Sequence, residues 1–355
     1  MTDTRYITAL RFPLACFVVL IHAHNTCWRN LGSHFIDDLG TFLSLTLPLF
    51  AVPLFFVISG YLFFFGTQEH GFTAHNYATK MKHRLRTLLV PYLAWNILAV
   101  ALYSAQAIAT GQSLQQPLSA NPLWGCRTTG VGFTNWLGMA VAPGTAPVHE
   151  VLWFVRDLIV VTLLSPLFHA LLKRGGVWAL LALAVVYYAQ LWQNPLGVTF
   201  NAFWWFAVGA FFAIRGLSMS RLALRLATPA AVIVIPAAAA TTLCSSALAT
   251  AARHIYVLCA IITAISIATW FAKRHTASPT LAKSSFFVYA AHTIFLLPLT
   301  KLFASLSAAT HSCAMEACCF ITPPILAAAL SVSTFYILHK FIPRLSSPLT
   351  AIVKN

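Results

Sequence analysis

Long apolar blocks separated by short polar segments dominate the chain. The blocks are about 18–25 residues long, the length that an α-helix needs to cross the hydrocarbon core of a bilayer. Membrane β-strands would instead alternate apolar and polar side chains at every second residue. The pattern therefore predicts an all-α bundle of about ten membrane-spanning helices. These are expected at roughly 7–24, 41–65, 88–109, 148–168, 176–193, 198–214, 227–248, 254–272, 284–306 and 318–340.

The basic residues between the blocks predict the orientation of the bundle, because cytoplasmic loops are enriched in Lys and Arg. With the N-terminus inside, sixteen of the 22 Lys and Arg residues fall in cytoplasmic segments and four on the outer side. The remaining two, Arg11 and Arg156, lie inside predicted spans. Both termini are therefore expected in the cytoplasm. Removing one span would invert the charge pattern downstream of it.

Composition supports a single integral membrane domain over residues 1–355. The chain is 59% apolar and 8% charged, whereas soluble domains carry about 25% charged residues. The net charge of +15 does not indicate a nucleic-acid partner, because the basic residues form short clusters between apolar blocks. The first block lacks a small-residue cleavage site after it and is interpreted as the first span.

The eight cysteines show no CxxC pair or zinc spacing, and no metal site is expected. Cys27, Cys126 and Cys313 fall on predicted outer loops, where two of them can form a disulfide in an oxidising compartment. The longest outer loop, about 110–147, is rich in Gly, Pro, Ser, Thr and Trp. It suits an acceptor-binding lid and a plain connector equally well.

Ionisable side chains inside spans are the first candidates for function, because each costs several kcal/mol unless it is paired or hydrated. Arg11 and His22 lie eleven residues apart in the first span. This spacing puts them on one helix face, roughly 16 Å apart along the axis. Arg11 is expected near the cytoplasmic boundary and His22 near the outer one. The alternatives are an interfacial anchor for Arg11 and a packing role for His22.

The outer end of the fourth predicted span carries a second group of polar residues. Glu150 and Asp157 are seven residues apart and share a face, while Arg156 points elsewhere. Arg156 is expected to find an acidic or polar partner on another helix, or to line a hydrated cavity. One interpretation is an ion pair that holds the bundle together. The other is a group that orients a catalytic histidine or contacts the acceptor, together with His149 and Trp153.

Two further features suggest substrate contacts. His292 lies in the middle of a predicted span, where packing and function are equally plausible roles. The cytoplasmic segment between the second and third spans carries Lys80, Lys82, Arg84 and Arg86. Such a segment determines topology, and it also suits a polyanionic cytosolic ligand such as the phosphates of coenzyme A.

Several motifs together resemble acyltransferase family 3, a family of integral membrane enzymes that acylate extracytoplasmic glycans and related acceptors. The resemblance covers nearly the whole chain in the expected order. One departure concerns the basic loop, where members often have Arg-x-x-Arg and this chain has Arg84 and Arg86 with one residue between them. The matching segments are Arg11 with His22, then Phe55 to Tyr61 around Ser59 and Gly60, then Arg84 to Tyr92, and Leu152 to Leu158, with weaker matches at Trp205 to Gly209 and Tyr289 to His292.

The resemblance implies acyl transfer at the bacterial inner membrane. The donor would be cytosolic acyl-CoA, most often acetyl-CoA, with no permanently bound cofactor. The acceptor would be a hydroxyl of an extracytoplasmic glycan or lipid-linked saccharide. Histidine suits the deprotonation of a hydroxyl, so His22 is expected to be the general base or a transient acyl carrier.

The other roles follow from the same chemistry. Glu150 or Asp157 would hold the His22 ring, as a carboxylate does in a catalytic triad. Arg156 or Ser59 would stabilise the oxyanion. Donor and substrate contacts are expected from Arg11, Ser59, Lys82, Arg84, Arg86, Trp153 and His292.

A transporter is the main alternative, because buried charges and many spans also suit a substrate pathway. Against it, the two halves show no matching pair of broken helices. A purely structural subunit is disfavoured by the number of intramembrane ionisable groups. The identity of the acceptor and the length of the acyl chain stay open.

Overall fold

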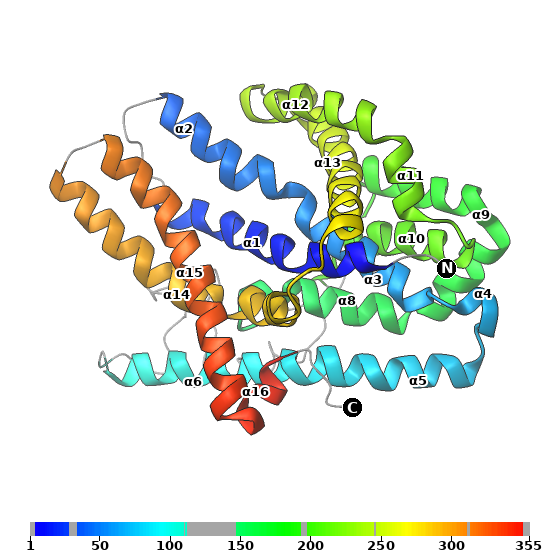
Figure 1. The fold of residues 1–355 in the computed structure, drawn as a ribbon, viewed down its shortest axis with the longest axis horizontal. Coiled ribbons are helices and arrows are strands. Elements are labelled where there is room, and N and C mark those ends of the chain that lie inside the picture. Colours follow the sequence, from blue (N-terminus) through cyan, green and yellow to red (C-terminus); the bar gives the residue numbers. More distant parts are fainter. Residues whose placement is uncertain are drawn as a thin grey trace. The chain divides into compact units, whose positions relative to one another are not determined.

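The computed structural model describes residues 4–27, 34–109, 111, 147–192, 197–244, 246–310 and 313–350, and these ranges contain helices and no β-strand (Figure 1). Seven helices in the described ranges are long and apolar enough to cross a membrane. The number rises to eight if Phe200–Ile214 and Met219–Arg225 form one broken span. The predicted all-α, multi-span architecture is confirmed at this level. The ten-span count and the cytoplasmic placement of the termini stay predictions.

Shorter apolar helices account for the difference between ten predicted spans and seven or eight. The block at 227–248 corresponds to α12 (Ala227–Leu243), which has 17 residues. The block at 148–168 contains η5 (Glu150–Leu152) and α8 (Trp153–Leu163), and α8 has 11 residues. These blocks are helical as expected, but length and composition alone do not qualify them as complete spans.

The described chain forms two compact units, of which the first comprises Met1–Phe55 and Ser218–Phe341. In this unit α1 packs against α13, α14 and α15, while α14 runs beside α15 and α12 beside α13 (Figure 1). Its elements are α1 (Arg5–Cys27), α2 (His34–Thr41), η1 (Phe42–Thr46), η2 (Leu47–Phe50), α11 (Met219–Arg225), α12, α13 (Ser246–Arg274), α14 (Pro279–Thr310) and α15 (Cys313–Phe341).

The second unit comprises Phe56–Leu217 and Ile342–Asn355, and α3 (Ala51–Phe64) contributes residues to both units. Within the second unit α10 packs against α8 and α9, and α16 packs against α6. Its remaining elements are α4 (Thr67–His70), α5 (Ala74–Arg84), η3 (Leu85–Leu89), α6 (Val90–Ala109), η5, α8, α9 (Ser165–Tyr188), α10 (Phe200–Ile214) and α16 (Pro343–Leu349).

Two of the helical segments change their hydrogen-bonding pattern next to a proline. The π-helical segment η1 is followed by Pro48 in η2, and the π-helical segment η3 is followed by Pro91 in α6. Proline lacks a backbone N–H, and its ring clashes with the carbonyl four residues before it. Local π and 3₁₀ pairing adjusts the backbone around such a residue. The helices therefore continue through both prolines.

Helix α9 is broken at Gly176, where φ is 57° and ψ is −132°. Glycine adopts this left-handed φ without steric cost. Arg215 closes the end of the first part, because its Nη2 donates to the carbonyls of Leu172 at 3.2 Å and Lys173 at 3.4 Å. The break lies beside the cytoplasmic loop predicted between the spans at 148–168 and 176–193. The second part of α9 lies in the span predicted at 176–193, and the first part lies mainly in the loop predicted before it.

Two glycines allow α3 and α10 to pack with their backbones in contact. A Cβ added to Gly60 would collide with the carbonyl of Phe206, and one added to Gly209 would collide with the carbonyl of Val57. Close backbone approach at small residues is a common way for membrane helices to associate. Packing therefore explains the glycines of two of the motifs that resemble acyltransferase family 3.

We expect Gly209→Ala to destabilise the protein, because neither backbone can move away without disturbing its helix. Overpacking of this kind costs about 1–3 kcal/mol. Thermal unfolding of the purified protein in one detergent, followed by tryptophan fluorescence, would measure the effect. Val208→Ile is the matched control, since it adds a methyl group at the neighbouring, half-buried position. Equal midpoints for Gly209→Ala and the wild type would contradict the packing argument.

Cysteine side chains are described only in part. No disulfide joins the cysteines whose side chains are described, which are Cys16, Cys244, Cys259, Cys318 and Cys319. The outer-loop candidates for a disulfide, Cys27, Cys126 and Cys313, lie outside the described side chains, as does most of the loop at 110–147.

Candidate active site

His22 and His292 are in ring contact within the first unit. α1 carries His22 near its C-terminal end and α14 carries His292, and the two ring centroids are 5.0 Å apart with the planes tilted by 48°. His22 is half-buried, and His292 is fully buried at 0% exposure. The sequence indicated each histidine separately, and the packing of α1 on α14 brings them together.

The backbone of α14 fixes the tautomer of His292. Its Nδ1 lies 2.7 Å from the carbonyl oxygen of Tyr289 and 3.2 Å from that of Val288. A carbonyl oxygen can only accept, so Nδ1 must carry the hydrogen and donate it. In the neutral ring the lone pair is then on Nε2. His292 is therefore held in one orientation with a defined basic nitrogen.

Arg11 lies on the same helix as His22. α1 is continuous from Arg5 to Cys27, so the helical rise puts the two residues roughly 16 Å apart along its axis. Arg11 is exposed, which suits contact with a ligand or with lipid headgroups. The first unit thus holds three of the predicted site residues: Arg11, His22 and His292.

The basic cluster between α3 and α6 belongs to the second unit, and its members have different environments. Lys80 Nζ donates to the carbonyls of Phe63 at 2.6 Å and Phe65 at 3.1 Å. Lys80 thereby provides hydrogen bonds to carbonyls that have no intrahelical partner at the C-terminal end of α3. Lys82 and Arg86 are exposed. Lys82 and Arg86 are accessible to a soluble anion, whereas Lys80 stabilises the fold through its hydrogen bonds at the end of α3.

Arg84 connects this cluster to Ser59. Its Nη2 lies 3.5 Å from the carbonyl oxygen of Ser59, and its guanidinium is 6.0 Å from the centroid of the Phe63 ring. Arg84 and Ser59 are both half-buried. Four residues predicted to contact the donor therefore lie in one unit, on α3, α5 and η3. They are Ser59, Lys82, Arg84 and Arg86. Their roles stay predictions.

Arg156 and Asp157 form a buried network with the start of α10. Arg156 donates to Asp157 Oδ1 through Nη2 at 2.8 Å and through Nε at 3.0 Å, and Nη2 also donates to the carbonyl of Gly197 at 2.5 Å. Asp157 Oδ2 accepts from the backbone N of Thr199 at 3.0 Å and from its hydroxyl at 2.9 Å. Thr199 is the N-cap of α10, where negative charge is favourable.

This network corrects one expectation and agrees with another. Arg156 is expected to find an acidic or polar partner on another helix, or to line a hydrated cavity, and its acidic partner is instead the next residue along α8. The long arginine side chain bends back far enough to reach its neighbour, although adjacent helical side chains do not face each other. The contact with Gly197 is the polar partner from a separate segment. The arrangement matches the ion pair proposed to hold the bundle together.

The other polar residues at this end of α8 differ in exposure. Glu150, at the start of η5, is exposed, and Trp153 at the start of α8 is half-buried. His149 is buried, stacks on Trp95 at 5.8 Å, and donates its backbone N–H to Asn96 Oδ1 at 3.2 Å. His149 is thus a packing residue of the second unit.

Sequence reasoning missed two residues of these networks. Asn96 is fully buried and donates to the carbonyl of Tyr92 at 2.7 Å. An uncharged amide inside an apolar block is the sequence signal for this residue, and a criterion based on ionisable groups does not include it. Thr199 stands directly before an apolar block, which is a helix N-cap signal. Within the described ranges no group of three His, Cys, Asp or Glu residues has the arrangement of a metal site.

The apolar helices and the polar groups among them define a multi-pass helical membrane protein. The model of the acyltransferase domain family matches residues 4–338 of the chain. The chain therefore belongs to acyltransferase family 3, and the family predicted from the motifs is confirmed.

One curated relative adds detail. The succinoglycan biosynthesis protein ExoH of Rhizobium meliloti (strain 1021) is 30% identical over 221 residues, which cover 61% of this chain and 55% of the relative. The alignment thus spans about half the length of that relative. No solved structure matches the chain.

Proposed function

We propose that this protein transfers an acyl group, most simply acetyl, from cytosolic acyl-CoA to a hydroxyl of an extracytoplasmic glycan or another cell-envelope acceptor. Family membership supports acyl transfer. The name of the relative, which assigns it to succinoglycan biosynthesis, supports a polysaccharide or its precursor as the acceptor. The contact between His22 and His292 carries the proposal, because it provides imidazole bases inside the first unit.

In the proposed reaction His22 removes the proton from the acceptor hydroxyl. The hydroxyl oxygen attacks the thioester carbonyl, and the carbonyl electrons move to form an oxyanion. When the oxyanion collapses, the C–S bond breaks and the coenzyme A thiolate leaves with the proton held by the imidazole. Arg156, one of the two groups expected to stabilise the oxyanion, already donates to Asp157 and Gly197. A transient acyl-imidazole on His22 is the covalent variant of this route.

His292 would assist by holding the ring of His22, which it contacts. With its hydrogen on Nδ1, His292 presents Nε2 as its basic nitrogen.

The topology gives the donor a route across the membrane. With ten spans and both termini in the cytoplasm, Arg11 lies at the cytoplasmic end of α1 and His22 near the outer end. The roughly 16 Å between them along the helix would be bridged by the pantetheine arm of the donor. The nucleotide end would stay on the cytoplasmic side, where the basic side chains are predicted. This arrangement needs no separate lipid carrier for the acyl group.

Inside-out membrane vesicles test the function directly. Vesicles that contain the protein and enclose an envelope extract in their lumen should transfer label to it from radiolabelled acetyl-CoA in the medium, and vesicles without the protein should not. Solute flux in proteoliposomes that lack acyl-CoA, without any transfer of label, would favour the transporter instead.

Lys82→Gln together with Arg86→Gln should weaken donor binding while leaving the chemical step intact. Loss of two phosphate contacts is expected to raise KM for acetyl-CoA by about tenfold with kcat nearly unchanged. Initial rates at varied acetyl-CoA concentration would measure both constants. Arg221→Gln with Arg225→Gln removes the same charge from exposed positions of α11 and is the control. An equal rise in KM for both double variants would indicate a general charge effect.

A further inference from the structure

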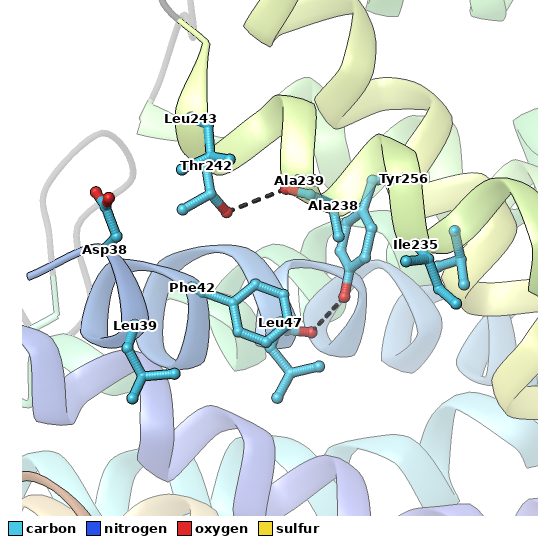
Figure 2. A pocket seen from close by; sticks show the side chains of 11 residues that line it. Asp38, Leu39, Phe42, Leu47, Ile235, Ala238, Ala239, Thr242, Leu243 and Tyr256 are labelled. Atoms are coloured by element: carbon cyan, nitrogen blue, oxygen red, sulfur yellow. Dashed lines mark hydrogen bonds between the residues drawn. The ribbon is translucent and has the colours of Figure 1, made fainter. Parts of the chain in front are cut away.

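A cavity of about 610 Å³ lies in the first unit between the segment from α2 to η2 and helices α12 and α13 (Figure 2). It is partly open to the surroundings, and we call it the lateral groove. Its walls are almost entirely apolar. The lining residues are Asp38, Leu39, Phe42, Leu47, Val234, Ile235, Ala238, Ala239, Thr242, Leu243 and Tyr256.

The polar atoms of two lining residues are bound to the protein. Thr242 donates its hydroxyl to the carbonyl of Ala238 at 3.0 Å and accepts from the hydroxyl of Thr46 at 2.9 Å. Tyr256 donates its hydroxyl to the carbonyl of Leu47 at 2.8 Å. The parts of these two side chains that line the groove are therefore apolar: the methyl group of Thr242 and the ring of Tyr256. Asp38, at one end beside Thr242 and Leu243, provides the charged group of the lining (Figure 2).

The groove is about as long as one leaflet is deep. Its two walls run from Asp38 to Leu47 and from Val234 to Leu243, ten residues each. At helical rise each wall is about 14 Å long, close to half of the roughly 30 Å hydrocarbon core. Asp38 lies just outside the span predicted at 41–65, and Leu243 lies near the outer end of the span predicted at 227–248. In the predicted topology the groove therefore reaches from the outer boundary toward the bilayer midplane, with Asp38 at the headgroup level.

The length of the groove, its apolar walls and the charge of Asp38 together indicate which kind of molecule can occupy it. Water needs two to four polar partners in a cavity, and the apolar walls offer none. An empty groove would forfeit dispersion contacts along its whole lining. A hydrocarbon chain that extends through one leaflet fits the length, whereas a much longer isoprenoid chain would exceed it. The carboxylate of Asp38 attracts a cationic headgroup and repels a phosphate or pyrophosphate.

We propose that the lateral groove is a binding site for one acyl chain of an outer-leaflet phospholipid whose headgroup carries an amine, with the ammonium group beside Asp38. The lipid completes the packing between η1 and α12. It also fixes the position of η1 and η2, which contact α1, the helix of His22. The proposal depends on the membrane topology and not on acyl transfer.

Photo-crosslinking tests the site. The full-length protein in nanodiscs would be exposed to phosphatidylethanolamine, phosphatidylglycerol or a polyprenyl phosphate, each with a diazirine in its hydrocarbon chain. Crosslinked peptides would be mapped by mass spectrometry. We expect labelling by phosphatidylethanolamine to concentrate on 38–47 and 234–243 relative to the exposed face of α9. Because one exposed ion pair is worth up to about 1 kcal/mol, the preference over phosphatidylglycerol should be about fivefold.

Two pairs of variants complete the test. Ile235→Trp fills the groove and should reduce its labelling about tenfold, since the site needs its full volume. Ile233→Trp is the control, because it places the same ring on an exposed position about 200° around the helix axis. Asp38→Asn should remove the preference for phosphatidylethanolamine without reducing total labelling.

Three results would overturn the proposal. Labelling spread evenly over all exposed apolar helices would indicate only the ordinary lipid annulus. Stronger labelling of the groove by the polyprenyl phosphate would identify a different occupant. Equal effects of the two tryptophan variants would show that the groove does not hold the chain.

Discussion

Replacement of His22 by alanine should lower the rate of acyl transfer by about 10²–10⁴-fold at saturating acetyl-CoA, the usual contribution of a positioned general base. In the proposed mechanism the imidazole receives the acceptor proton, and no alanine atom can take that role. The residues proposed to bind the donor, Arg11, Lys82 and Arg86, are unchanged in this variant, so KM for acetyl-CoA should change little. Label transfer in inside-out vesicles with equal amounts of each variant would measure the loss.

Two further variants separate chemistry from folding. His254→Ala removes a histidine of α13 in the same unit and should retain activity. His292→Phe keeps an aromatic ring against α1 and removes both ring nitrogens. The decrease in activity of this variant therefore measures the assistance that His292 gives to His22. Wild-type activity in the His22→Ala variant would exclude His22 as the base. A full loss only in His292→Phe would transfer the base role to His292.

Asp157→Ala should destabilise the protein by about 3–5 kcal/mol, because breaking one side of a buried ion pair leaves its partner uncompensated. Asp157 is fully buried, and the side chain of Arg156 is 15% exposed. The variant also removes the two hydrogen bonds at Thr199 that begin α10. Thermal unfolding and the monodisperse yield in detergent would show the loss.

A double replacement distinguishes a buried charge from a general packing defect. Arg156→Met with Asp157→Leu removes both charges and keeps apolar volume, so it should recover much of the stability lost in Asp157→Ala. Glu69→Ala, at an exposed carboxylate that lies 4.0 Å from His70, should leave stability unchanged. If Asp157→Ala unfolds at the wild-type midpoint, the network does not anchor α10.

The Arg156 network also bears on the roles assigned from sequence. Asp157 was a candidate to orient His22, as was Glu150. In the structure both oxygens of Asp157 are occupied by Arg156 and Thr199. Glu150 is exposed, and its assignment stays a prediction. His292 is the neighbour that the structure places against His22.

Much of the architecture follows from the sequence alone. Apolar block length and the distribution of Lys and Arg report local burial in lipid and orientation, and neither depends on which helices are neighbours. For this reason the helices appear where the blocks predict them. The candidate residues Arg11, His22, Arg156 and His292 were found by the same reasoning, because a polar group in an apolar block is visible without a fold.

Only the tertiary structure decided which of these residues meet. The contact of His22 with His292, the network of Arg156, Asp157 and Thr199, and the lateral groove each join segments far apart in the chain. The breaks at Gly176 and the π-segments before Pro48 and Pro91 also depend on how the backbone is accommodated around them. Such contacts depend on the packing of whole helix faces, and periodicity in one segment carries no information about the helix that will pack against it.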